Sequence, residues 1–182
     1  MLEQEPYRIA DPDGLETPAM VVFEEMVDHN IAALCDLVGG AANLMVHVKT
    51  HKSEAIAKKQ LAAGIAGFKC ATLRELEMGL EAGAPEAILA YPMVQRRKVE
   101  RFAEISAKYR DQQAYAAVGD ERHVQILAEV ARARQQTLAV MVDLDVGMHR
   151  TGASLGEEAG GLYAAINAAE GLEAGGLHVY DG

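Results

Sequence analysis

The sequence predicts an α/β fold of the (β/α)8 TIM-barrel type, with about six βα units in this chain. Apolar segments of strand length alternate with amphipathic segments of helix length from residue 43 to residue 180. This alternation requires parallel strands joined by right-handed crossovers, which doubly wound sheets and barrels both satisfy. No Gly-x-Gly-x-x-Gly or Walker pattern follows a predicted strand, which disfavours a dinucleotide-binding sheet. Polar side chains at several strand ends favour the barrel, because barrel active sites collect there.

The elements follow one another with a steady spacing. A short strand is expected at Ala19–Phe23, and apolar residues at helical spacing predict a helix over 24–38. Further helices are expected near 53–63, 72–83, 96–109, 120–134 and 154–169. Capping-box patterns open two of them, Thr72-Leu73-Arg74-Glu75 and Ser154-Leu155-Gly156-Glu157, and Asp120 is an N-cap for another. The six barrel strands are expected to begin at Asn43, Ile65, Ala87, Gln113, Leu138 and Gly175.

Composition narrows the function classes. Half of the 182 residues are apolar, which is typical of a soluble globular protein. The formal net charge of −10 disfavours binding to nucleic acid or to an anionic membrane. No signal pattern or long apolar run is present, and a cytoplasmic location is expected. Cys35 and Cys70 form neither a metal spacing nor a disulfide framework, and no His, Cys, Asp or Glu set has metal-ligand spacing.

The stretch from Asn43 to Lys52 carries the strongest indication of chemistry. Alternation along a strand places Leu44, Val46 and Val48 on one apolar face, while Met45, His47 and Lys49 share the other. A lysine held inward at a strand end can lose solvation and attack a carbonyl as a free amine. The alternative is a basic turn whose two lysines, Lys49 and Lys52, are simply solvated.

Two later strands end in similar clusters. Leu138 to Leu144 predicts one apolar face and one face with Met141, Asp143 and Asp145, followed by a glycine-flanked loop that carries Arg150. Arg150 offers a fork of donors to a phenolate, carboxylate or phosphate, or else pairs with Asp143 or Asp145 to hold the loop. On the last strand, Leu177 and Val179 are expected to face the helices. His178 and Tyr180 then face the same interior as Lys49.

Three motifs in this order carry a family resemblance: His-Val-Lys-Thr-His-Lys from His47, Asp-Val-Gly-Met-His-Arg-Thr-Gly from Asp145 and Gly-Leu-His-Val-Tyr-Asp-Gly from Gly176. The chain resembles the D-threonine aldolase and D-serine dehydratase group of the alanine-racemase-like (fold type III) pyridoxal-phosphate enzymes. The similarity runs from Thr17 to the last residue and includes Cys70-Ala71-Thr72 and Leu89-Ala90-Tyr91-Pro92.

The resemblance implies roles for three residues, and a fourth residue is a candidate beside them. Lys49 matches the lysine that forms a Schiff base with pyridoxal phosphate, Arg150 an arginine near the cofactor's phenolic oxygen, and Tyr180 the aromatic position beside the ring. His47, on the same face, is expected to be a further cofactor contact. The implied function is a lyase that cleaves β-hydroxy-D-amino acids to glycine and an aldehyde. Dehydration of D-serine or 3-hydroxy-D-aspartate, a non-catalytic pyridoxal-phosphate carrier and a cofactor-free barrel aldolase are the alternatives.

The resemblance also implies a longer protein. Family members continue through two more barrel units and a C-terminal β domain, which carry the phosphate-binding loops and the ligands of a divalent metal. We therefore expect residues 17–182 to be a partial cofactor-binding barrel, with residues 1–16 associated with the β domain. A chain of this length alone is expected to be inactive and poorly soluble, because open sheet edges favour aggregation. A small D-amino acid is the expected substrate, and a homodimer is compatible with the resemblance.

Overall fold

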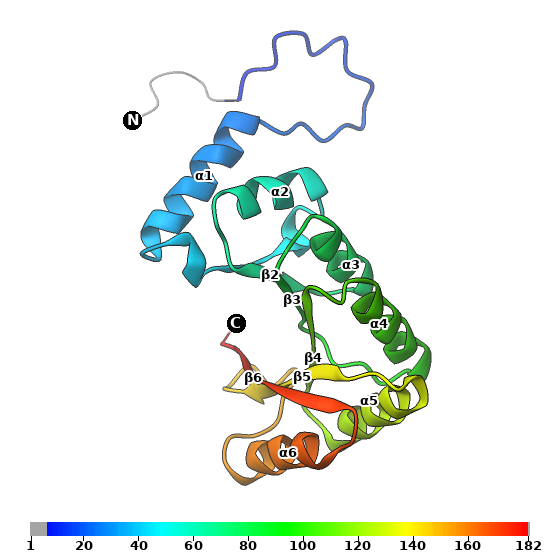
Figure 1. Ribbon diagram of the computed structural model, residues 1–182. Coiled ribbons are helices and arrows are strands. Elements are labelled where there is room, and N and C mark those ends of the chain that lie inside the picture. Colours follow the sequence, from blue (N-terminus) through cyan, green and yellow to red (C-terminus); the bar gives the residue numbers. More distant parts are fainter. Residues whose placement is uncertain (1–6, 182) are drawn as a thin grey trace.

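The computed structural model describes residues 7–181, and its six strands form one parallel sheet in the sequential order β1-β2-β3-β4-β5-β6. Figure 1 shows the curved sheet with helices packed along one side of it. The strands are β1 (Met45–His47), β2 (Gly67–Cys70), β3 (Glu86–Leu89), β4 (Gln113–Val118), β5 (Leu138–Asp145) and β6 (Leu172–Tyr180). The predicted partial TIM-type barrel is thereby confirmed.

Within residues 7–181, six α-helices connect and flank these strands. They are α1 (Glu24–Leu37), α2 (Glu54–Ala62), α3 (Leu73–Glu81), α4 (Arg96–Lys108), α5 (Glu121–Arg134) and α6 (Glu157–Ala168). Two short 3-10 turns, η1 (Ala41–Asn43) and η2 (Val48–Thr50), precede and follow β1. Residues 1–6 of the predicted N-terminal segment, and Gly182, lie outside the described residues.

The core lies between the sheet and the helices, and strand alternation decides which side chains enter it. In β5, Leu138, Val140, Val142 and Leu144 all belong to the buried apolar cluster, as predicted. Phe68 and Cys70 of β2 enter the same cluster and are fully buried. The residues between them therefore point to the opposite, concave face of the sheet, where a barrel interior lies.

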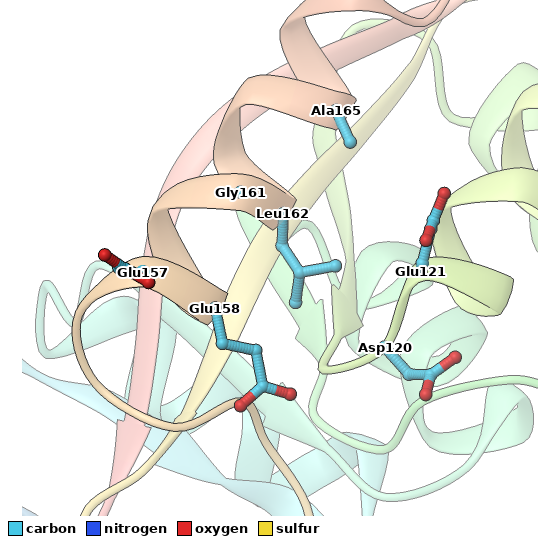
Figure 2. A pocket seen from close by; sticks show the side chains of 7 residues that line it. All are labelled: Asp120, Glu121, Glu157, Glu158, Gly161, Leu162 and Ala165. Carbon is cyan, nitrogen blue, oxygen red and sulfur yellow. The ribbon is translucent and has the colours of Figure 1, made fainter.

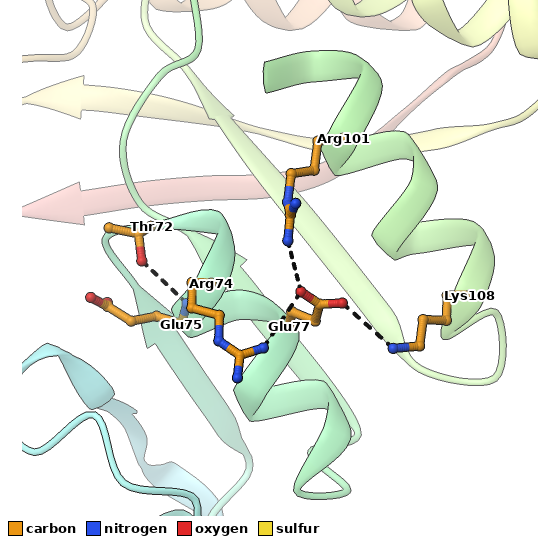
Figure 3. A network of polar contacts seen from close by, with 6 residues as sticks. All are labelled: Thr72, Arg74, Glu75, Glu77, Arg101 and Lys108. Carbon is orange, nitrogen blue, oxygen red and sulfur yellow. Dashed lines mark hydrogen bonds and ion pairs between the residues drawn. The ribbon is translucent and has the colours of Figure 1, made fainter. Parts of the chain in front are cut away.

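Side-chain caps fix where the helices begin. The Thr72 hydroxyl accepts a hydrogen bond from Glu75 N (3.2 Å), and the Glu75 carboxylate accepts one from Ala71 N (2.8 Å). This confirms the first predicted capping box, with Ala71 as the backbone partner of Glu75. Figure 3 also shows Glu77 of α3 between Arg101 and Lys108 of α4, at 3.0 Å and 3.5 Å, which ties the two helices together at the surface.

The second predicted capping box is wrong. Helix α6 begins only at Glu157, after Gly156 with a φ of +96°, and the Ser154 backbone N–H donates to the carboxylate of Glu158 (2.8 Å). A left-handed residue directly before Glu157 prevents the helix from starting at Ser154. By contrast, Asp120 caps α5 as predicted, by accepting from Arg122 N at 2.8 Å.

The predicted strand at Ala19–Phe23 is also wrong. The segment forms no ladder with the sheet, and its apolar side chains are largely exposed, with Met20 at 84%. Apolar composition alone does not make a strand when no neighbouring strand offers hydrogen-bond partners. Within residues 7–181, none of the helices combines the length and the apolarity needed to cross a membrane.

Candidate active site

Lys49 lies in the turn directly after β1. The strand ends at His47, so Lys49 belongs to the 3-10 turn η2 and not to the last strand position as predicted. The apolar face is as expected, because Val48 is fully buried and Leu44 and Val46 pack against the core. The His47 ring accepts a hydrogen bond from Lys49 N (3.3 Å). This contact shapes the turn that leaves the Lys49 side chain exposed at the carboxyl edge of the sheet.

His47 is a neutral imidazole in this setting. Burial, together with the charges of Lys49 and Lys69, lowers its pKa to about 4, while Glu75 opposes this shift. Because Nδ1 accepts from the backbone of Lys49, the neutral ring carries its proton on Nε2 and can donate it to a ligand. The predicted candidate therefore has a proton to donate at neutral pH.

A second inward lysine, Lys69, was missed by the sequence reasoning. It lies directly opposite His47 in the β1–β2 register, between the buried residues Phe68 and Cys70. Its Nζ is 4.8 Å from the centre of the Tyr180 ring. Burial lowers the pKa of Lys69, Asp143 opposes this, and Lys49 and Arg150 lower the pKa further. The alternation of its own strand was the signal that could have placed it inside.

Arg150 packs between aromatic rings. Its guanidinium carbon is 5.1 Å from the centre of the Tyr91 ring and 5.0 Å from that of Tyr180, distances typical of cation–π contacts. Among the described residues it forms no ion pair with Asp143 or Asp145, so the loop-holding alternative is not what is seen.

Asp145 holds the loop instead. Its carboxylate accepts hydrogen bonds from Gly147 N (3.0 Å) and His149 N (2.9 Å) and contacts the His149 ring at 2.9 Å. These contacts lower the pKa of Asp145, with the His149 backbone bond as the largest cause. Gly152 closes the loop, since a Cβ there would lie 2.6 Å from Asp145 N. Arg150 is thus left available to bind a ligand.

Asp143 and His178 form a buried pair on the concave face. They are 2% and 7% exposed, and Oδ1 of Asp143 lies 2.5 Å from Nδ1 of His178. Within the described part of the chain, the other two polar atoms, Asp143 Oδ2 and His178 Nε2, are buried with no hydrogen-bond partner. Unpaired buried polar atoms are costly and rare, and they indicate a site completed by a further group.

The site therefore combines cations, a proton donor and a buried acid–histidine pair on one concave face. Lys49, Lys69 and Arg150 form no ion pair within 4 Å among residues 7–181. Such a set fits an anionic carbonyl compound, because an amine can condense with the carbonyl while the other cations bind its negative oxygens. In the same residues, no three His, Cys, Asp or Glu side chains lie close enough together to hold a metal ion.

A different hollow, between the amino ends of α5 and α6, is not this site. Figure 2 shows it lined by four carboxylates, those of Asp120, Glu121, Glu157 and Glu158. Asp120 caps α5 and Glu158 accepts from Ser154 N, so two of the four carboxylates satisfy the backbone at helix starts. Acidic side chains are generally favourable there because they oppose the helix dipole.

Comparison with known proteins decides the family. The family model described as "Alanine racemase, N-terminal domain" matches residues 24–181. The chain belongs to this family. It is 30% identical to the D-threonine aldolase of Filomicrobium marinum, with a TM-score of 0.79 over 89% of this chain and 43% of that one. The D-threo-3-hydroxyaspartate dehydratase of a Delftia species is 29% identical over 139 residues, which are 76% of this chain and 36% of the relative.

The resemblance predicted from the sequence is therefore confirmed, including the D-threonine aldolase and dehydratase group of fold type III enzymes. An alanine racemase of Clostridium difficile, at 15% identity and a TM-score of 0.66, shares the fold. The chain spans less than half the length of each of these relatives.

Proposed function

We propose that this chain carries the lysine-bearing half of a pyridoxal-phosphate-dependent lyase that cleaves β-hydroxy-D-amino acids. The observation that carries the proposal is the placement of Lys49, exposed in the turn after β1 on the edge of a concave face with Arg150 and Tyr180. The similarity to a D-threonine aldolase supports retro-aldol cleavage to glycine and an aldehyde.

The residues that would hold the cofactor fit its chemistry. Lys49 would bind the carbonyl carbon covalently, Arg150 the phenolic oxygen, and Tyr180 the edge of the ring. His47 would donate a hydrogen bond from Nε2–H to an oxygen of the cofactor or of the substrate. When bound, pyridoxal phosphate supplies an electron sink for the bond-breaking step.

The chain's own residues prepare this chemistry. The exposed amine of Lys49 can reach an incoming carbonyl, because the turn, not a buried strand, carries it. Arg150 is held by two aromatic rings and no carboxylate, so its donors are directed to a ligand at little cost. Asp143 and His178 on the same concave face offer one acceptor each, Oδ2 and Nε2. Their buried setting strengthens polar contacts.

Dehydration is the second candidate. The observation in its favour is the 29% identity to a D-threo-3-hydroxyaspartate dehydratase over 139 residues. In that reaction the α-proton leaves and the hydroxyl is eliminated, whereas retro-aldol cleavage starts from deprotonation of the β-hydroxyl. We further propose a cytoplasmic enzyme whose divalent metal is bound by ligands outside this chain.

Borohydride reduction of the pyridoxal-phosphate complex, followed by peptide mapping, tests the proposal. The label is expected on Lys49, and a Lys49→Ala variant should take up none. Labelling of Lys52 or Lys69 instead would overturn the assignment. Incubation of the full-length protein with D-threonine or with D-threo-3-hydroxyaspartate then separates the two activities, since only cleavage releases glycine and only dehydration releases ammonia.

A further inference from the structure

Lys69 lies within electrostatic reach of both other cations of the site, Lys49 and Arg150. Both Lys49 and Arg150 act on the charge of Lys69, and Lys69 and Arg150 both contact the ring of Tyr180, at 4.8 Å and 5.0 Å. Like charges held together in a half-buried setting repel one another and lose hydration. An anion that enters between them relieves both costs, so the arrangement favours anion binding.

The protein itself does not supply that anion. The charge of Asp143 acts on Lys69, yet Oδ1 of Asp143 is taken by His178, and the described residues contain no ion pair between Lys69 and any carboxylate within 4 Å. Asp145 is committed to its own loop. Glu75 is committed to the cap of α3. The Lys69 ammonium is therefore placed on the concave face with an aromatic ring and no counter-ion.

The negative charges of the proposed reactants match these cations that lack a counter-ion. With Lys49 assigned to the carbonyl carbon of the cofactor, Lys69 and Arg150 are the two cations of the site that remain to bind anionic oxygens. When an α-amino acid lies beside the cofactor ring, two groups carry anionic oxygens. They are the α-carboxylate of the amino acid and the phenolic oxygen of the cofactor. Arg150, with its planar fork, suits one of them, and a compact ammonium such as Lys69 suits the other.

We propose that Lys69 binds the α-carboxylate of the amino-acid substrate and so orients the substrate beside Lys49. This inference rests on the proposed function and deepens it, because it names the group that recognises an amino acid as opposed to an amine. The Tyr180 ring holds the Lys69 ammonium through a cation–π contact, so that the ammonium is positioned before the substrate arrives.

The test uses two ligands that differ only in the carboxylate. D-Alanine and D-alaninamide both lack a β-hydroxyl and cannot be cleaved, and their binding to the pyridoxal-phosphate form is measured from the visible absorption of the cofactor. Lys69→Met is expected to weaken D-alanine binding about 10- to 100-fold, the loss typical of a charge-assisted hydrogen bond, and to leave D-alaninamide binding unchanged. Lys69→Arg should keep most of the preference for the carboxylate.

Lys98→Met is the matched control, because Lys98 is exposed on α4 and takes no part in the site. It should bind both ligands like the unaltered protein. Equal weakening of both ligands by Lys69→Met, or no weakening of either, would overturn the inference while borohydride labelling of Lys49 still upheld the proposed function. Absence of any label on Lys49 would overturn both.

Discussion

The buried pair of Asp143 and His178 should contribute measurably to the free energy of unfolding, and the size of this contribution follows from the structure. Each side chain makes one hydrogen bond, to the other, and both are more than nine-tenths buried, so solvent screens the contact little. A hydrogen bond with a charged partner contributes about 1.5–3 kcal/mol, and removing one member leaves the other buried and unpaired. We expect Asp143→Ala to cost about 3 kcal/mol, and Asp143→Asn less, because the amide oxygen still accepts.

A double-mutant cycle isolates the contact. Urea unfolding of Asp143→Ala, His178→Ala and the double variant should give a coupling energy of about 2 kcal/mol. The exposed pair of Glu54 and Lys58, 2.6 Å apart, is the matched control and should give less than about 1 kcal/mol. The reasoning is that the contact is strong because it is buried and because each side chain has no other hydrogen-bond partner. A coupling energy no larger than that of this surface pair would refute it.

Three further predictions concern single side chains. In the full-length protein, Arg150→Leu should reduce turnover about 100-fold, as loss of a preorganised donor does, with little change in unfolding free energy; normal kinetics would show that Arg150 only packs on its rings. Thr72→Ala should cost about 1 kcal/mol in unfolding free energy through the lost cap, whereas Ser154→Ala, whose hydroxyl caps nothing, should cost far less; equal losses would contradict this. Between pH 6.5 and about 4 the unfolded chain binds a proton at His47 that the folded chain does not, so stability should fall as the pH falls; His47→Gln should flatten this slope in urea unfolding, and an unchanged slope would exclude His47 as the cause.

Much of the fold could be predicted because local rules decided it. Apolar alternation in Leu138–Leu144 fixed which face of β5 enters the core, and capping residues such as Thr72 and Asp120 fixed helix starts. The same alternation predicted Lys49 and Tyr180 at strand ends on one face, and Tyr180 does end β6, but Lys49 lies in the turn after β1. The strand predicted at Ala19–Phe23 does not form, because a strand needs a neighbouring strand as hydrogen-bond partner and composition does not reveal one.

Parts of the site depended on contacts between distant residues. Asp143 and His178 are 35 residues apart, and only the β5–β6 register brings them together. Lys69 reaches Tyr180 across the concave face from β2, a contact that no spacing along the chain encodes. Sequence patterns assign a residue to a face, but the curvature of the sheet decides which residues on that face meet.

One irregularity in β6 shows how a single residue completes the site. Strand β6 begins at Leu172, earlier than the predicted Gly175, and Gly175 is an extra residue between Ala174, which pairs with Val140, and Gly176, which pairs with Met141. Only glycine fits there, because a Cβ would lie 2.4 Å from the ring of Tyr115.

The extra residue reverses which side chains face the barrel interior. Leu172 and Ala174 pack against the core, so regular alternation from them would direct His178 towards the helices. The shift at Gly175 instead places His178 beside Asp143 and Tyr180 beside Asp145 in the register, on the concave face. Leu177 and Val179 take the outer face, where they are about half exposed. The aromatic ring that contacts Lys69 and Arg150, and the partner of Asp143, are therefore both in the site because one glycine bulges out of the ladder.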